Sequence, residues 1–178
     1  MAFRFFWLSV FILVSTAQSA WMWGQNLTFP KRQMSVLLGH SMRGWFNHGD
    51  SLELWLDSTA KMPLNRGDFA ILNKGGNPKI PILKKIVGLP GDSLYLGGAD
   101  SCFLFINCSP VRGPSGADLK FPLKRKKLII SMLKRIKGVL PPALFWVTGS
   151  SPGTHDSSLF GPVHRSQIMG IAKPHVLP

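Results

Sequence analysis

The chain has 178 residues, of which 45% are hydrophobic and 16% charged, and its net charge is +13. This length allows one domain with its own core and gives no reason to expect a multidomain or disordered protein. The 14 prolines and 18 glycines favour short strands joined by turns over long helices. The positive charge is typical of proteins that bind nucleic acid or an anionic membrane, and its position along the chain decides between them.

The N-terminal segment, residues 5–23, contains no charged side chain. Its length is close to the ~20 residues that cross a bilayer, and two tryptophans at its end resemble an interfacial belt. Arg4 before it predicts an N-terminus in the cytoplasm. Several polar residues in its second half also fit a cleaved secretory leader. We therefore expect residues 1–24 to be a membrane anchor or a signal peptide, and residues 25–178 to be an exported catalytic domain.

The rest of the chain predicts a mainly β protein. Short apolar or alternating segments, separated by turn residues, are typical of strands. They cover residues 51–56, 69–72, 80–89, 93–96, 103–106, 144–148 and 168–172.

One segment, residues 124–137, has helical periodicity. Its apolar face consists of Leu128, Ile129, Met132, Leu133 and Ile136, and it lies between Pro122 and Gly138. From Arg112 to Lys137 there are nine Lys or Arg and one Asp, so this region holds +8 of the net charge. A basic amphipathic helix in an exported, tethered protein fits an anionic lipid surface, and an ordinary solvated helix packed on the sheets is the alternative. Few aromatics interrupt the basic residues, so we expect no nucleic acid partner.

Cys102 and Cys108 are the only cysteines. Their even number fits a disulfide across a hairpin in an oxidising compartment, and two buried thiols are the alternative. No histidine stands at metal-ligand spacing from them, so the sequence predicts neither a metal nor another cofactor.

Three segments carry candidate chemistry. Lys84 and Lys85 lie in an apolar strand that ends in Pro90-Gly91-Asp92, and burial can lower the pKa of such a lysine until it becomes a base. Both faces of this strand are apolar, so periodicity does not choose between the two lysines. Upstream, Ser41 follows a glycine and a histidine, and Asn65-Arg66-Gly67-Asp68-Phe69 lies between.

In this order, the three segments resemble the boxes of type I signal peptidases, the membrane-bound Ser/Lys proteases that remove leader peptides. The resemblance implies that Ser41 is the nucleophile and that Lys84, the first lysine of the pair, is the general base. It implies structural roles near the site for Lys85, Arg66 and Asp68. A lysine can replace the usual histidine because a neutral amine can accept the serine proton.

Two further positions are carried over from the resemblance, with departures from the family pattern. Gly39 stands where the family usually has a hydroxyl residue that contributes to the oxyanion hole. Residues 147–163 resemble the last family box, in which Thr154 takes the place of a hydroxyl that hydrogen-bonds the base lysine. Asp156 would be structural, paired with Arg66, and Ser158 replaces the arginine usually found there.

Histidine competes for the role of base, because Ser-His-Asp is the commoner hydrolase arrangement. His155, beside Asp156, is the best rival, whereas His40 is adjacent to Ser41 and points to the opposite face of an extended chain. Loop histidines without a role are the other interpretation.

The resemblance implies coiled antiparallel sheets forming a barrel-like catalytic fold, one N-terminal transmembrane helix, and an insertion at about residues 93–142 that contains the basic helix. It implies a single-pass protein of the bacterial inner membrane with its catalytic domain in the periplasm. The run from Ser41 to Trp45 is most similar to the signal-peptidase-like enzymes that mature pilins in conjugative transfer systems. Expected partners are a precursor protein with a leader peptide and membrane lipids. Joining of peptide ends, or a catalytically inactive binding or assembly protein, are the alternatives.

Overall fold

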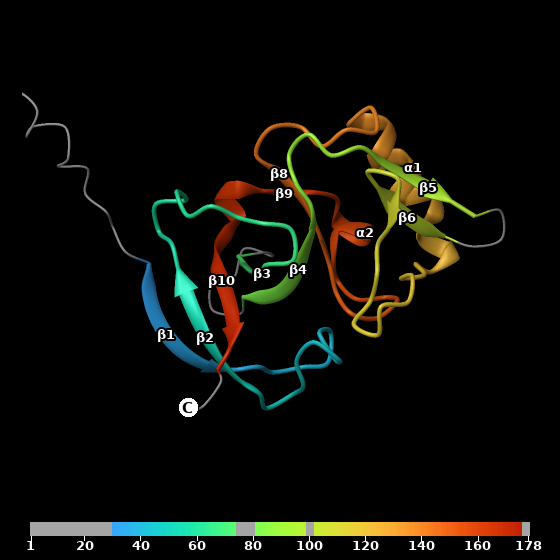
Figure 1. Cartoon of the computed structure of the whole chain (residues 1–178). Helices are drawn as coiled ribbons and strands as arrows, with labels where there is room; N and C mark the ends of the chain where they lie inside the picture. The colour runs from blue at the N-terminus through green and yellow to red at the C-terminus, as the bar shows by residue number, and fades with distance from the viewer. Residues whose placement is uncertain (1–29, 74–80, 99–101, 176–178) are drawn as a thin grey trace, which may run out of the picture.

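A seven-stranded antiparallel sheet forms the larger part of the protein. The computed structural model describes residues 30–73, 81–98 and 102–175. The strands lie in the order β1-β2-β10-β3-β4-β8-β9 (Figure 1). They are β1 (Lys31–Val36), β2 (Ser51–Leu56), β3 (Phe69–Leu72), β4 (Ile82–Gly88), β8 (Leu144–Thr148), β9 (Val163–His164) and β10 (Ile168–Pro174).

A three-stranded sheet and the main helix form a second unit, which Figure 1 shows beside β4 and β8. The sheet contains β5 (Leu94–Gly97), β6 (Phe103–Ile106) and β7 (Ser109–Pro110), and the helical turn η2 (Leu123–Arg125) leads into α1 (Lys126–Arg135). Leu104, Ile129 and Trp146 are almost fully buried in one core, which joins the small sheet, α1 and β8. Burial of this apolar surface holds the second unit against the larger sheet.

The prediction of a mainly β, antiparallel fold is confirmed, and the prediction of a barrel is wrong. Neither sheet closes within the part of the chain that the structure describes, because β1 and β9 remain separate edges of the larger sheet. A two-residue strand such as β9 offers little backbone for a closing ladder. The structure also contains β1, an edge strand that the sequence did not reveal because nearly all its side chains are exposed.

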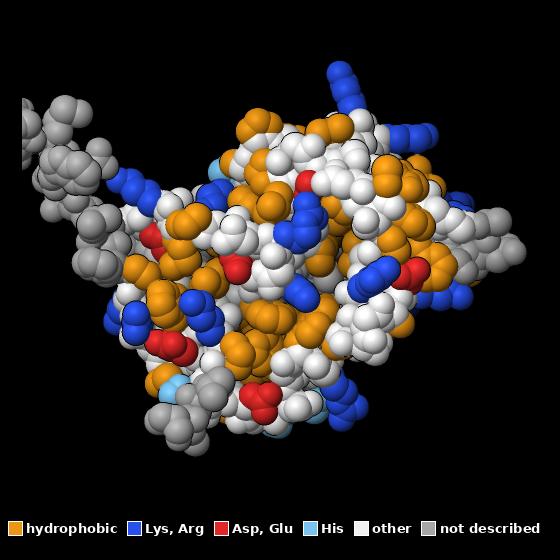
Figure 2. Space-filling view, viewed as in Figure 1, with side chains coloured by type: hydrophobic (Ala, Val, Ile, Leu, Met, Phe, Trp, Pro, Cys, Tyr) orange, Lys and Arg blue, Asp and Glu red, His pale blue; other side chains and the backbone are white. Residues whose placement is uncertain are grey.

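The basic helix begins and ends close to the predicted positions. Ile129 and Leu133 are buried on its inner face, as its periodicity predicts. The chain leaves the helix through Gly138, which has φ of +71°, a conformation that glycine adopts without steric cost. Figure 2 shows Lys and Arg side chains projecting from the part of the surface that carries α1.

The two cysteines are free thiols. Cys102 is buried and Cys108 exposed, and they lie at opposite ends of β6. Because β6 alone spans about 13 Å, a bridge across this hairpin is excluded in the folded protein. Burial raises the pKa of the Cys102 thiol, which keeps it protonated.

The predicted membrane segment, residues 5–23, lies outside the described residues. Within the described ranges, no helix has the length and hydropathy needed to cross a bilayer.

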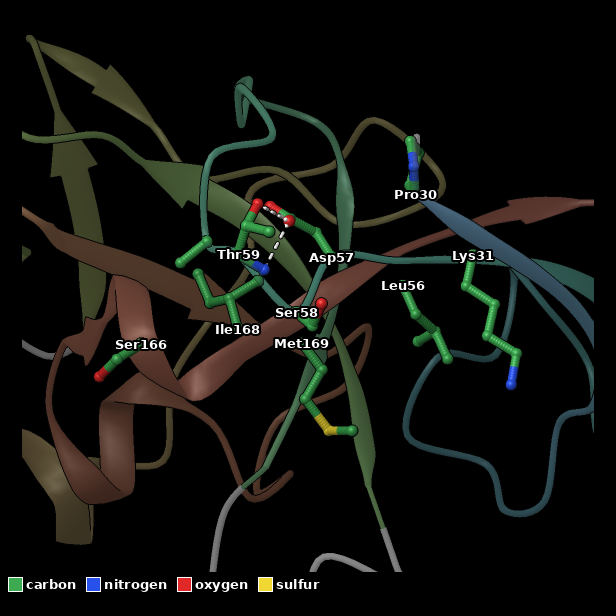
Figure 3. A pocket seen from close by; sticks show the side chains of 10 residues that line it. Pro30, Lys31, Leu56, Asp57, Ser58, Thr59, Ser166, Ile168 and Met169 are labelled. Atoms are coloured by element: carbon green, nitrogen blue, oxygen red, sulfur yellow. Dashed lines mark hydrogen bonds between the residues drawn. The ribbon is translucent and has the colours of Figure 1, made fainter. Parts of the chain in front are cut away.

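A hollow of about 530 Å³ lies where β1 begins and β2 ends (Figure 3). Asp57 on its wall accepts hydrogen bonds from Thr59 and the amide of Met62, and it pairs with Arg165 at 2.9 Å. Burial opposes ionisation of this carboxyl, but these hydrogen bonds lower its pKa to about 2. The lining contains no member of the predicted site, so this hollow is a structural feature of the sheet end.

Candidate active site

Ser41 lies in the loop that joins β1 to β2. Buried Met42 and Phe46 fix the loop to the core, where Phe46 packs edge-on against Phe69 at 4.6 Å between ring centroids. The Ser41 carbonyl accepts hydrogen bonds from the amide and hydroxyl of Ser150, at 2.9 and 3.2 Å. The backbone of the serine is therefore held from two sides, by the core and by the segment after β8.

Lys84 projects from β4 toward the protein interior. The inward face of this strand carries Lys84, Ile86 and Gly88, all buried, whereas Lys85 lies on the other face. The Lys85 ammonium lies 4.7 Å from the centroid of the Trp45 ring, a cation–π contact. The fold thus distinguishes two lysines that the hydrophobic pattern left equivalent.

The side chains of Ser41 and Lys84 meet, although they are 43 positions apart in sequence. Lys84 Nζ donates to Ser41 Oγ at 2.8 Å and to the Leu83 carbonyl at 2.8 Å. Lys84 is only 2% exposed. Burial lowers its pKa from 10.5 to about 8, against the opposing effect of the Asp156 carboxylate. A substantial fraction of this amine is therefore neutral slightly above neutral pH.

Asp156 organises the segment that follows β8, and it is 2% exposed. One carboxylate oxygen accepts from the amide and hydroxyl of Ser158, at 3.0 and 2.6 Å. The other accepts from the Gly149 amide at 3.1 Å and from Thr154 Oγ1 at 2.6 Å. The carboxylate also caps the short helix α2 (Ser157–Phe160). These bonds fix a compact loop beside Lys84.

Thr154 lies in this loop, and its hydroxyl donates to Asp156. The sequence predicted a hydrogen bond from this hydroxyl to Lys84, but the recorded bonds of the amine go to Ser41 and Leu83. A Cβ added to Gly149 would lie 2.4 Å from Thr154 Oγ1 and 2.7 Å from the Ser41 carbonyl oxygen. Thr154 therefore lies within the site and contacts the lysine's electrostatic partner.

Arg125 is a residue of the site that sequence reasoning missed. It comes from η2, and its guanidinium lies 3.7 Å from Asp156 with a side chain 9% exposed. The amphipathic pattern assigned it to the solvated side of the predicted helix. One signal was available: Ser158 leaves the last box without its usual cation, so another segment had to supply one.

Arg66 does not pair with Asp156, and that prediction is wrong. Its Nη2 donates to both carboxylate oxygens of Asp92, at 2.8 and 2.7 Å, and its Nη1 donates to the Val87 carbonyl. Asp92 also accepts from Asn107 at 2.6 Å. Burial opposes the ionisation of Asp92, but hydrogen bonds from the Leu89 amide, Asn107 and Arg66 lower its pKa.

Arg66 pairs with Asp92 instead of Asp156 because of where the two carboxylates lie. Arg66 reaches the Pro90-Gly91-Asp92 turn after β4, whereas Asp156 follows β8 and already faces Arg125. Asp68 accepts from the Asn65 amide at 2.7 Å, and its carbonyl accepts from the Ile86 amide at 2.8 Å. Arg66 therefore holds the turn after β4, and Asp68 holds the turn before β3 beside the same end of β4.

Gly39 departs from the family pattern for a conformational reason. Its φ is +101°, so a residue with a side chain would be strained there even though no atom obstructs a Cβ. The Gly39 amide donates to His48 Nδ1 at 3.0 Å, and the His48 ring lies 5.4 Å from that of His40. Gly39 has no hydroxyl to offer an oxyanion, and its amide is already bonded to His48.

The histidine alternative has no geometric support among the described residues. His155 is exposed, and Asp156 is bonded to Thr154, Ser158 and Gly149 instead. His40 is also exposed, and its ring lies tilted against that of His48. The titratable side chain in contact with Ser41 Oγ is Lys84.

The arrangement can carry out acyl transfer. A hydroxyl in contact with a buried amine of lowered pKa is the geometry required for activation of a serine nucleophile. Within the described residues, no group of three or more His, Cys, Asp or Glu side chains is placed to hold a metal ion.

The comparisons with known proteins agree with this geometry. No curated protein matches the sequence. Residues 7–176 match the family described as "Signal peptidase, peptidase S26". This match covers nearly the whole chain and includes every residue of the site described above. The chain therefore belongs to the signal peptidase family, peptidase S26, a family of serine peptidases.

Proposed function

We propose that this protein is a membrane-anchored serine endopeptidase in which Ser41 and Lys84 form a catalytic dyad. The observation that carries the proposal is the 2.8 Å contact between Lys84 Nζ and Ser41 Oγ, made by an amine that is 2% exposed. Membership of the signal peptidase family implies a substrate protein with a leader peptide.

The dyad would work in two steps. The neutral amine of Lys84 accepts the Ser41 proton as Oγ attacks the scissile carbonyl, and the resulting ammonium gives that proton to the departing amine. Water then attacks the acyl-enzyme, passing a proton to Lys84 and returning the hydroxyl to Ser41. The Ser41 amide is our candidate for an oxyanion donor, because no acceptor is recorded for it among the described residues.

An extended substrate segment would dock beside the first half of β4. Residues Ile82 to Lys84 pair with β3 on one side, and the ladder to β8 begins only at Lys85. On that second side, the described residues place no strand next to Ile82 and Leu83. A peptide could pair with this edge in the β-augmentation mode, where it would share the Leu83 carbonyl that already accepts from Lys84 Nζ. Such pairing would deliver the scissile bond to the adjacent Lys84 and Ser41.

The substrate we propose is a pilin precursor in a conjugative transfer system. The support is the resemblance of the run from Ser41 to Trp45 to pilin-maturation peptidases. We further propose that residues 5–23 anchor the chain in the bacterial inner membrane with the catalytic domain in the periplasm, on the strength of their hydropathy and of Arg4 before them.

We also propose that α1 contacts anionic lipid. Lys127 and Lys134 are exposed on it, and apolar Leu123 and Val139 at its two ends are 55% and 46% exposed. Cations with exposed apolar neighbours suit an anionic headgroup surface. In nanodiscs, α1 amides should exchange more slowly with phosphatidylglycerol than with phosphatidylcholine, and a Lys127→Glu/Lys134→Glu variant should remove that difference. Equal exchange in both lipids would exclude the contact.

The peptidase proposal is tested with a candidate pilin precursor and the full-length protein in membranes. The parent should shorten the precursor, whereas Ser41→Ala and Lys84→Ala should not. Lys85→Ala is the matched control, because it removes a neighbouring lysine that faces Trp45 instead of Ser41. Cleavage by the Ser41 or Lys84 variant at the parental rate would refute the dyad. The mass of the product separates hydrolysis from joining of its ends, since a joined product is lighter by one water.

A catalytically inactive binding or assembly protein is the second candidate. The observation in its favour is Gly39, which has no hydroxyl and whose amide is bonded to His48. If the parent and all variants bind the precursor equally and none shortens it, the assembly function is the better description.

A further inference from the structure

The Arg125 guanidinium is buried beside the site and donates three hydrogen bonds there. Nη1 donates to Ser158 Oγ at 2.6 Å and to the Thr154 carbonyl at 2.8 Å, and Nη2 donates to the Gly153 carbonyl at 2.8 Å. Its side chain is 9% exposed. A buried arginine is rare unless it is paired, and this one holds three acceptors of a single loop. The contact therefore joins the insertion, residues 93–142, to the loop beside Lys84.

The same guanidinium balances the charge that acts on Lys84. Asp156 lies 3.7 Å from Arg125, and its carboxylate favours the charged form of Lys84. A cation close to Asp156 weakens that effect in a poorly solvated site. Lys85 lies over Trp45, whereas Arg125 is a cation within ion-pair distance of Asp156. Arg125 is thus the cation placed to offset Asp156.

Ser158 lies between Arg125 and Asp156 and bonds to both. Ser158 is fully buried, and its Oγ touches both Arg125 Nη1 and Asp156 Oδ1, at 2.6 Å each. The side chain at position 158 therefore points into the space between the guanidinium and the carboxylate. An arginine side chain at position 158 would occupy the space that the Arg125 guanidinium now fills. The small side chain of Ser158 leaves room for Arg125.

We propose that Arg125 is a positioning residue for the Ser41–Lys84 pair, which acts from the insertion by holding residues 153–158 and by neutralising Asp156. It supplies the positive charge that the family pattern places at position 158, where this chain has a serine. The inference rests on the proposed peptidase function for its role in catalysis, but the coupling of Arg125 to Lys84 is measurable without a substrate.

The test compares four variants of the full chain in detergent: Arg125→Gln, Arg125→Lys, Arg125→Gln/Ser158→Arg, and Lys124→Gln as a control. Lys124 is an exposed cation next to Arg125, so its replacement removes the same charge without touching the loop. The reactivity of Lys84 toward acetic anhydride is followed against pH by mass spectrometry. Thermal unfolding is recorded for each variant.

Arg125→Gln should raise the midpoint of Lys84 reactivity by about one pH unit, because Asp156 is no longer balanced. Arg125→Lys keeps the charge, so it should lower stability but leave the midpoint near that of the parent. Ser158→Arg should restore the parental midpoint in the Arg125→Gln background. Lys124→Gln should change nothing.

Equal midpoints in the parent and in folded Arg125→Gln would overturn the proposal, because a merely structural arginine would change stability alone. If Arg125→Gln does not fold, the double variant decides: failure to regain both the fold and the parental midpoint overturns it as well. For an active enzyme, kcat/KM at pH 7 should fall about tenfold in Arg125→Gln, the loss that a one-unit shift of the base produces. A parent that reacts normally at Lys84 but cleaves no precursor would refute the proposed function and leave the role of Arg125 intact.

Discussion

Replacing Lys84 by methionine should abolish activity and stabilise the protein at neutral pH. Methionine has a similar length and no charge, so it fills the same space without an ammonium in the interior. The parent has a Lys84 pKa lowered from 10.5 to about 8 by burial. At about 1.36 kcal/mol per unit, keeping this amine in the folded protein below pH 8 costs roughly 3 kcal/mol.

The sign of the pH dependence follows from the two pKa values. The unfolded chain binds the Lys84 proton up to about pH 10.5, whereas the folded protein releases it at about pH 8. The stability of the parent therefore rises with pH through this window, and the variant has no such group. The difference in unfolding free energy, variant minus parent, should fall by roughly 2 to 3 kcal/mol between pH 7 and pH 10. Lost hydrogen bonds to Ser41 and Leu83 subtract about 1–2 kcal/mol at every pH.

The assay is urea unfolding of the full chain in detergent micelles, followed by tryptophan fluorescence at pH 7, 8, 9 and 10. Lys85→Met is the matched control, since it makes the same substitution on the other face of β4. Its difference from the parent should be nearly constant over this range. A Lys84→Met difference that is also constant would refute the reasoning, because it would mean that the buried amine does not titrate below its ordinary pKa.

Three further outcomes are expected. Below about pH 7, kcat/KM should fall about tenfold for each unit of decreasing pH, because only neutral Lys84 accepts the Ser41 proton; a flat profile would contradict this role. Gly149→Ala should lower kcat by about a hundredfold, because the added Cβ would lie 2.7 Å from the Ser41 carbonyl oxygen and displace the serine. Gly113→Ala is the control and should leave kcat unchanged, because the nearest atom to its Cβ would be 3.7 Å away. Asp57→Asn should lower stability by about 2 kcal/mol at pH 7 and by about half as much at pH 3, because the contribution of this carboxylate is lost as the pH falls toward its pKa of about 2; urea midpoints at the two pH values measure it.

Strands with a clear apolar face could be predicted from the sequence. β2 and β6 have the predicted bounds, and in β6 the buried and half-buried side chains alternate as the sequence pattern predicts. β1 has almost no buried side chain, and it exists because its backbone pairs with β2 along its whole length. Such a strand leaves no hydrophobic signal. The prediction of a barrel was wrong for a related reason. Closure of a sheet depends on which edge strands pair, and local periodicity does not determine that pairing.

The choice between Lys84 and Lys85 marks the limit of periodicity. Both faces of β4 carry apolar neighbours, because one face meets the core of the seven-stranded sheet and the other meets the Trp45 and Phe69 rings. Only the resemblance to a family box selected Lys84, and the fold now gives the physical difference: one lysine is buried against a hydroxyl, and the other is half-buried over an aromatic ring.

Arg125 shows what a sequence departure can and cannot predict. The absence of an arginine at position 158 signals that the carboxylate beside it needs another cation, but spacing gives no way to find one 33 positions upstream. The helical pattern even argued against it, since it placed this arginine among solvated lysines. One physical clue remained: a cation at a helix N-terminus is opposed by the helix dipole, so a cluster of cations there calls for compensating contacts. Arg125 has them in Ser158 and the carbonyls of Gly153 and Thr154. Arg125 therefore joins η2 to the loop after β8, and it supplies from another segment a cation that is absent at position 158.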